Sequence, residues 1–114
     1  MRTLILPCFT GLLVGGCAGQ QEVLPTETIS FRTQVAPVIE RSCAGCHAVG
    51  GSNARDAVYM DASGRATYAN VRGGIALALR EIESGHMPPR AGVAVSTEER
   101  LRIKAWVAQG SKDN

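Results

Sequence analysis

The sequence predicts an all-α domain over residues 29–114 of the 114-residue chain. Apolar residues recur at the three- and four-residue spacing of a helix face in three stretches of this range, and no stretch shows the period-two alternation of a half-buried strand. The sequence has no internal repeat, and a chain of this length normally forms one domain. The remaining residues, 1–28, predict a leader followed by a tether.

Residues 1–16 predict a cleaved signal peptide. Arg2 precedes an apolar stretch that is shorter than the roughly 20 residues of a membrane span but suits an export signal. The sequence VGGC at its end resembles the processing site of bacterial lipoproteins, in which the cysteine, here Cys17, carries the lipid. The resemblance implies a lipid-anchored protein on the periplasmic side of a bacterial membrane, and Ala18 favours the outer membrane. Residues 17–28 then form the lipidated cysteine and a flexible tether; the alternative is an ordinary signal peptide with an incidental Cys17.

The first helix is predicted over residues 30–42. Ser30 provides an N-cap for it. Its apolar face consists of Phe31, Val35, Val38 and Ile39. Because Pro37 removes a backbone hydrogen bond inside this stretch, we expect a kinked helix. The alternative is that Pro37 opens the helix and that residues 31–36 are extended.

The middle of the chain is predicted to be mostly irregular. Residues 48–66 are rich in glycine and show no period, so we expect a loop and at most one helical turn after it. Gly73 and Gly74 are expected to break the helical pattern after this turn. A second helix follows, and Gly85 suits the position after its last turn. Its apolar positions are Ile75, Leu79 and Ile82.

The last helix is the one best defined by sequence. Ser96 and Glu99 match the capping box of a helix N-terminus, and Gly110 marks the end of the helix. We expect one face to be buried. This face carries Leu101, Ala105 and Ala108, flanked by Trp106 and Val107.

Charge and composition exclude several classes of function. The chain carries 12 basic and 10 acidic residues, and Arg2 leaves with the signal peptide. Because the remaining charge is nearly balanced and the basic residues are scattered, nothing favours a nucleic-acid partner. The sequence contains no paired carboxylates, phosphate-binding glycine loop or Ser–His arrangement in a suitable context. We therefore expect neither an enzyme nor a small-molecule substrate.

The stretch CAGCH, residues 43–47, carries the chemistry. Cys43 and Cys46 are spaced to lie on one side of a helical turn, where both thiols can take part in one structure. The three candidates are the disulfide of a redox pair, a zinc site and a covalently attached haem. A redox pair favours a strand–helix context and zinc favours a second pair of thiols, and the sequence shows neither. In haem attachment both thiols bond vinyl groups and His47 binds the iron; C-x-x-C-H is the signature of that arrangement.

These residues together resemble a known family. CAGCH after an amphipathic helix, a downstream MPP, and a closing helix with Trp106 and a final glycine are similar to the small class I monohaem cytochromes c of bacterial lipoproteins, over about residues 30–111. The resemblance implies a helical fold around one haem c, held covalently by Cys43 and Cys46, with His47 as proximal iron ligand. It also implies a membrane-tethered one-electron carrier whose partners are redox proteins. Aromatic residues make up only 4% of the sequence, so a haem would help to fill the interior.

The sixth iron ligand is predicted to be Met87. Pro88 and Pro89 follow it and stiffen the backbone without needing amide partners, and the MPP match points the same way. A thioether on the iron raises the reduction potential. Met60 is expected to fill the core, and His86 is the alternative ligand. A bis-His or open site would instead suit a haem-bearing subunit of an enzyme complex, a sensor or a peroxidase.

Weaker expectations concern the surroundings of the haem. Arg65, Arg72 or Arg90 could pair with a haem propionate, because guanidinium groups bind carboxylates well. Trp106 is expected to pack against the haem or the first helix. A propionate is one candidate partner for its Nε1–H.

Overall fold

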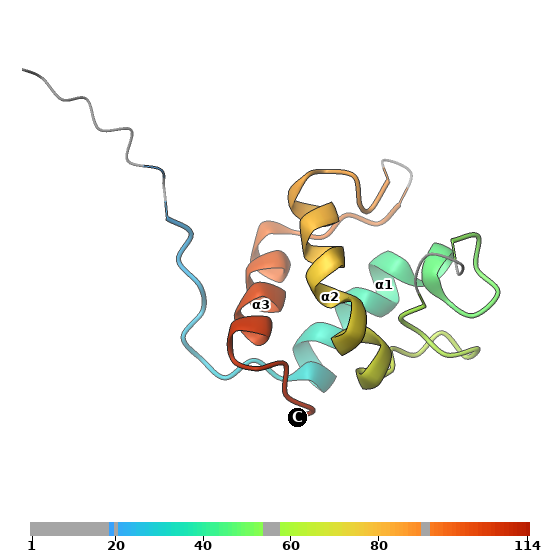
Figure 1. Cartoon of the computed structure of the whole chain (residues 1–114), viewed down its shortest axis with the longest axis horizontal. Helices are drawn as coiled ribbons and strands as arrows, with labels where there is room; N and C mark the ends of the chain where they lie inside the picture. Colours follow the sequence, from blue (N-terminus) through green and yellow to red (C-terminus); the bar gives the residue numbers. More distant parts are fainter. Residues whose placement is uncertain (1–18, 20, 54–57, 90–91) are drawn as a thin grey trace, which may run out of the picture.

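The computed structural model describes residues 19, 21–53, 58–89 and 92–114. In this part of the chain a short π-helix, η1 (Phe31–Val35), is followed by α1 (Ala36–His47), α2 (Tyr68–Glu83) and α3 (Thr97–Ala108) (Figure 1). The described residues contain no strand, only isolated bridges of Met60 with Ala48 and Ala66, so the all-α class is confirmed. None of the described helices is long and apolar enough to cross a bilayer.

The helices share one core. η1 contacts both α1 and α3, and α2 contacts α3. The apolar face predicted for the first helix is buried, and Met60 lies in the same core with no exposed surface, as predicted. Every buried side chain in the described part of the chain is hydrophobic, so the polar groups that matter for function lie at the edge of this core.

Pro37 shapes the start of α1. Because proline lacks an N–H and crowds the carbonyl four residues earlier, a regular α-helix cannot run through it undisturbed. The structure places Pro37 in the first turn of α1 and widens the preceding turn into η1, where the Val35 N–H donates to the Ser30 carbonyl at 3.2 Å. The stretch before Pro37 is therefore helical and not extended. The Ser30 hydroxyl caps it, as predicted.

α2 is continuous where a break was expected. The predicted interruption at Gly73 and Gly74 is wrong, because a buried stripe on α2 favours the helix over the glycines. The stripe consists of Val71, Ile75 and Leu79. Gly74 lies against Tyr59, where a Cβ would come within 2.5 Å of Tyr59 Cε1. This glycine therefore serves close packing and not a turn.

Both ends of α3 are confirmed. The Ser96 hydroxyl accepts a hydrogen bond from the Glu99 N–H at 3.1 Å, and the Glu99 carboxylate accepts one from the Ser96 N–H at 2.9 Å. These are the two halves of a capping box. Gly110 follows the helix with a φ of 96°, a left-handed conformation that favours glycine.

The buried face of α3 differs from the predicted one. Of Leu101, Ala105 and Ala108, only Ala105 is buried, and Ile103 and Trp106 occupy the core instead. The Trp106 Nε1–H donates to the carbonyl of Lys112 at 2.9 Å. The suggested partner for this group, a haem propionate, is therefore wrong.

Three aromatic rings meet where η1, the start of α2 and the end of α3 converge. The Phe31 ring centroid lies 5.4 Å from that of Tyr68 and 5.5 Å from that of Trp106. The Tyr68 hydroxyl donates to the carbonyl of Ser111 at 2.7 Å, so the chain after α3 covers the cluster. Trp106 is fully buried at its centre.

Trp106→Ala is expected to lower the free energy of unfolding by about 3–5 kcal/mol, the range for removing a large buried aromatic side chain. Trp106→Phe keeps most ring contacts and loses the hydrogen bond to Lys112, so it should lower the free energy of unfolding by less than Trp106→Ala does. Denaturant unfolding followed by circular dichroism measures both. Equal losses in the two variants would contradict the packing role of the indole.

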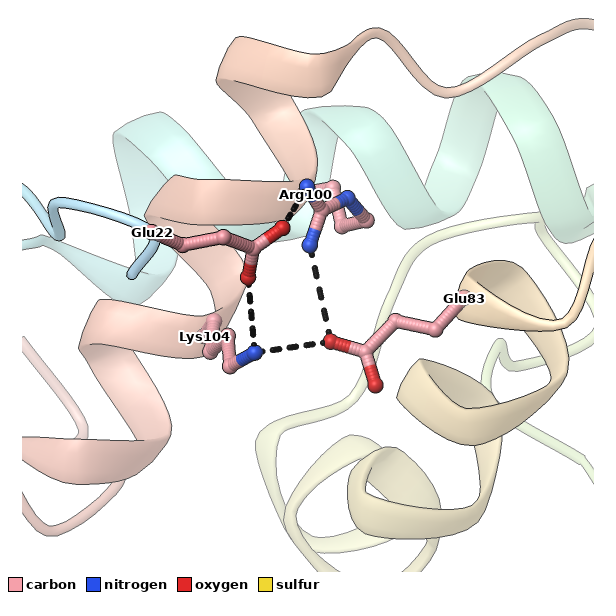
Figure 2. A network of polar contacts seen from close by, with 4 residues as sticks. All are labelled: Glu22, Glu83, Arg100 and Lys104. Atoms are coloured by element: carbon pink, nitrogen blue, oxygen red, sulfur yellow. Dashed lines mark hydrogen bonds and ion pairs between the residues drawn. The ribbon is translucent and has the colours of Figure 1, made fainter. Parts of the chain in front are cut away.

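The segment before η1 is bound to the domain (Figure 2). The Glu22 carboxylate pairs with Arg100 and, at 2.8 Å, with Lys104, and Lys104 also pairs with Glu83 of α2 at 2.9 Å. Hydrogen bonds from Arg100 and Lys104 lower the pKa of Glu22 to about 2. Residues 17–28 were predicted to form a flexible tether; from Glu22 on, the structure places this segment along α3.

A second ion pair joins α1 to the capping box of α3. Arg41 Nη2 lies 2.7 Å from Glu99 Oε2. The hydrogen bond from Arg41, with a smaller contribution from Ser96, lowers the pKa of Glu99 from about 4.5 to about 2. A carboxylate whose pKa is lowered by folding stabilises the fold above its ordinary pKa, and this stabilisation is lost as the pH falls toward the lowered value.

Glu99→Gln is expected to change the acid side of the stability profile. Glutamine can still complete the capping box but carries no charge, so the variant loses an ion pair worth about 0.2–1 kcal/mol. The difference from the parent should be present at pH 7 and shrink between about pH 4.5 and pH 2, which thermal unfolding at several pH values measures. Glu27→Gln, at an exposed carboxylate to which the structure gives no ion pair among the described residues, is the control. A difference that stays constant down to pH 2 would count against the ion pair.

Candidate functional site

A cavity of about 280 Å³ lies where the end of α1, one face of α2 and the segment after α2 meet. Its lining includes the four side chains predicted to hold a haem: Cys43, Cys46, His47 and Met87. Most of the other lining residues are apolar. They include Leu77, Ala78 and Ile82 of α2, and Pro88, Pro89 and Val95 after it. Glu81 is the one carboxylate among the described lining residues.

The last turn of α1 carries three of these side chains. α1 continues past the predicted end at Ser42 and includes the whole CAGCH stretch. Cys43 and Cys46 stand one helical turn apart and both line the cavity, as does the adjacent His47. The i, i+3 spacing of the thiols therefore brings them to one side of the helix, as predicted.

The glycine-rich loop after His47 holds the end of α1. The Asn53 N–H donates to the Cys46 carbonyl at 2.9 Å, and the Tyr59 N–H donates to the His47 carbonyl at 3.0 Å. These bonds satisfy two carbonyls that a helix end leaves without partners. Gly51 makes the approach possible, because a Cβ there would come within 2.5 Å of the Cys46 carbonyl oxygen. The loop thus fixes the backbone that carries Cys46 and His47.

The end of α2 directs Met87 into the cavity. Gly85 follows the helix with a φ of 79°, and the His86 N–H donates to the Glu81 carbonyl at 3.0 Å, as in a Schellman motif. The prediction for Gly85 is confirmed. The Met87 N–H donates to the same Glu81 carbonyl at 3.0 Å. Because Pro88 follows directly and fixes its own φ, the backbone on both sides of Met87 is constrained.

The Cys43 thiol is partly buried. Desolvation by burial and, second, the charge of Cys46 raise the pKa of Cys43 to about 11. Thiols that exchange disulfides need a lowered pKa, because the thiolate is the attacking species. Cys43 and Cys46 are both free thiols. Cys43 therefore lacks the setting of a redox-active cysteine.

The candidates for a sixth ligand occupy different places. The side chain of His86 is 75% exposed, and its Nδ1 lies 3.3 Å from the Glu81 carboxylate and 3.1 Å from the Ser84 hydroxyl. Met60 is buried in the core and, like His86, is not among the residues that line the cavity. Of the three candidates, Met87 is the one that lines the cavity.

Two other residues predicted to surround the haem do not line the cavity. Arg65 and Arg72 are exposed and are not among the described residues that line the cavity. Arg90, Cys17 and the predicted signal peptide over 1–16 lie outside the described residues.

Tyr59 is a residue of the site that the sequence did not reveal. It lines the cavity, is 6% exposed, and its ring centroid lies 5.4 Å from that of His47. The sequence showed only a tyrosine in an aperiodic loop and, at Gly74, an expected helix break. Tyr59 and Gly74 lie in separate segments of the chain. The local sequence around either residue therefore does not predict their contact.

The geometry of the cavity is the evidence for a functional site. Within the described ranges, no group of three or more His, Cys, Asp or Glu side chains is placed to hold a metal ion. No known protein family matches the chain, and neither a curated protein nor a solved structure matches it. What the structure provides is an imidazole, a thioether and two thiols around one mostly apolar cavity.

Proposed function

We propose that the chain is a c-type monohaem cytochrome that carries one electron at a time between redox proteins. The observation that carries the proposal is the gathering of Cys43, Cys46, His47 and Met87 around one cavity. These residues come from two segments far apart in the sequence, so local spacing alone does not bring them together. Two thiols, an imidazole and a thioether form the donor set of haem c with His/Met ligation.

The residues present fit such a group. Cys43 and Cys46 would each add the S–H bond across a haem vinyl group, forming a thioether and leaving the thiol proton on the vinyl carbon. His47 and Met87 would be the two axial ligands of the iron. Haem supplies an iron that gains one electron from a reduced protein donor and loses it to an oxidised protein acceptor. Because His47 and Met87 would together hold the iron, we assign no catalytic residue and no small-molecule substrate.

The lining of the cavity supports electron transfer at a raised potential. Apolar walls disfavour the additional charge of the ferric state, and thioether ligation favours the ferrous state. The cavity volume of about 280 Å³ is slightly below the roughly 300–1,000 Å³ of ligand sites, so the cavity does not enclose a large ligand completely. Leu77 lines the cavity and is 49% exposed. A ligand as large as haem therefore keeps an edge in solvent, where a protein partner can exchange electrons.

Three observations count against the alternatives. The raised pKa of Cys43 is opposite to that of a disulfide-exchanging thiol. Structural zinc needs four ligands, and no group of three or more His, Cys, Asp or Glu side chains among the described residues is placed to hold a metal ion. The exposed position of His86 disfavours bis-His ligation.

We also propose that a lipid anchors the protein to a membrane. A lipid on Cys17 would hold the protein on the periplasmic side of a bacterial membrane, with the outer membrane favoured. This part rests on the leader sequence, in which VGGC follows an apolar stretch.

Absorbance spectra of the exported protein, oxidised and reduced, test the function. We expect a reversible change of one electron per chain and no change when carbon monoxide is added to the reduced protein, because both axial positions are filled. Binding of carbon monoxide would favour the alternative, a haem-bearing subunit with an open site that acts in an enzyme complex or as a sensor or peroxidase. Absence of haem would overturn both and leave Cys43 and Cys46 as a thiol pair.

A further inference from the structure

Tyr59 is fixed between His47 and α2. Its ring centroid lies 5.4 Å from that of His47, with the two planes inclined by 54°. Its N–H donates to the His47 carbonyl at 3.0 Å, and its own carbonyl accepts a hydrogen bond from the Thr67 N–H at 3.1 Å. Both the backbone and the ring of Tyr59 are therefore placed relative to His47.

Gly74 provides the space that the Tyr59 ring occupies. A Cβ at Gly74 would lie 2.5 Å from Tyr59 Cε1 and 3.2 Å from both Cζ and the hydroxyl oxygen. At the adjacent Gly73, a Cβ would meet nothing within 4 Å. Glycine inside a helix is less stable than alanine, so both positions weaken α2, but only Gly74 is needed for the contact with Tyr59.

We infer that Tyr59 is a positioning residue that fixes the orientation of the His47 imidazole, and that Gly74 maintains this contact by leaving room for the Tyr59 ring. The inference rests on the proposed function, in which His47 binds the haem iron. A group that holds the ring of a ligating histidine sets its orientation and thereby tunes the metal.

The aromatic ring of Tyr59, and not its hydroxyl, makes the contact. The hydroxyl lies 3.5 Å from the Gly74 carbonyl, at the long limit of a hydrogen bond. Tyr59→Phe should therefore preserve the position of His47. Tyr59→Leu removes the ring and should release it.

Gly74→Ala and Gly73→Ala form a matched pair for the test in the exported protein. The readouts are the NMR resonances of the His47 imidazole in the reduced protein and the midpoint potential. We expect Gly74→Ala and Tyr59→Leu to shift both, and Gly73→Ala and Tyr59→Phe to leave both at the parent values. Adding Gly74→Ala to Tyr59→Leu should cause no further shift, because the smaller side chain leaves the space open.

Unshifted His47 resonances in Gly74→Ala would overturn the inference, even if that variant is less stable, because Gly74 would then serve packing alone. Additive shifts in the double variant would overturn it too. If Gly74→Ala does not fold, Tyr59→Leu against Tyr59→Phe makes the same comparison. The mass of the CAGCH peptide tests the proposed function separately: a chain without haem refutes that function, whereas a chain with covalent haem and unshifted His47 resonances in Gly74→Ala refutes the positioning role alone.

Discussion

Met87→Ala is expected to remove the weak long-wavelength band of thioether-ligated ferric haem and to open the iron to added ligands. Met87 is the sixth-ligand candidate that lines the cavity, and the Glu81 carbonyl and Pro88 constrain its backbone. Alanine leaves no donor in its place. Because the thioether favours ferrous iron, the reduction potential should fall, within the range of about 0.8 V that axial ligands span. Absorbance spectra, imidazole titration and a redox titration measure the three effects.

Two further variants control for the loss of a methionine and for the rival ligand. Met60→Leu changes a buried methionine of the core; it should cost less than about 1.5 kcal/mol of stability and leave the band unchanged. His86→Gln changes an exposed imidazole and should leave both the band and the potential unchanged. If His86→Gln abolishes the native spectrum while Met87→Ala preserves it, the assignment of Met87 is wrong and His86 is the ligand.

Replacing Cys43 and Cys46 together by serine is expected to abolish covalent haem completely. Serine has nearly the same shape, but its hydroxyl does not take the place of the thiol in the thioether. Denaturing extraction should then release all pigment from the chain, whereas the parent retains it. Each single variant keeps one thiol and should retain haem through one bond. Absorbance of the extracted polypeptide and of the solvent measures the partition.

Cys17→Ser is the matched control for the double serine variant. It changes the predicted lipid site and lies outside the CAGCH stretch. We expect this variant to keep covalent haem and to lose membrane attachment. Haem retained by the Cys43, Cys46 double variant through denaturation would contradict the thioether assignment.

Helix ends were the part of the fold that the sequence predicted best. Ser96 with Glu99, Gly85 and Gly110 each satisfy backbone groups within a few residues, so a short motif contains the whole interaction. The same holds for the CAGCH stretch, where one helical turn brings Cys43 and Cys46 together.

Contacts between distant segments could not be predicted from the sequence. Gly74 resembles a helix break until the Tyr59 ring is placed against it. Leu101 was expected in the core, but it lies with residues 23–27, a segment predicted to be tether, around a shallow surface pocket. The partner of Trp106 is likewise a backbone carbonyl after α3 that no periodicity reveals.

The mass of one peptide tests the central claim most directly. Trypsin cleaves after Arg41 and Arg55, which releases residues 42–55 with both cysteines and His47 and without the predicted lipid site. The account predicts that this peptide, from denatured exported protein, exceeds its amino-acid mass by one haem and absorbs visible light. A peptide at its bare mass, with two free thiols or one disulfide, would contradict it.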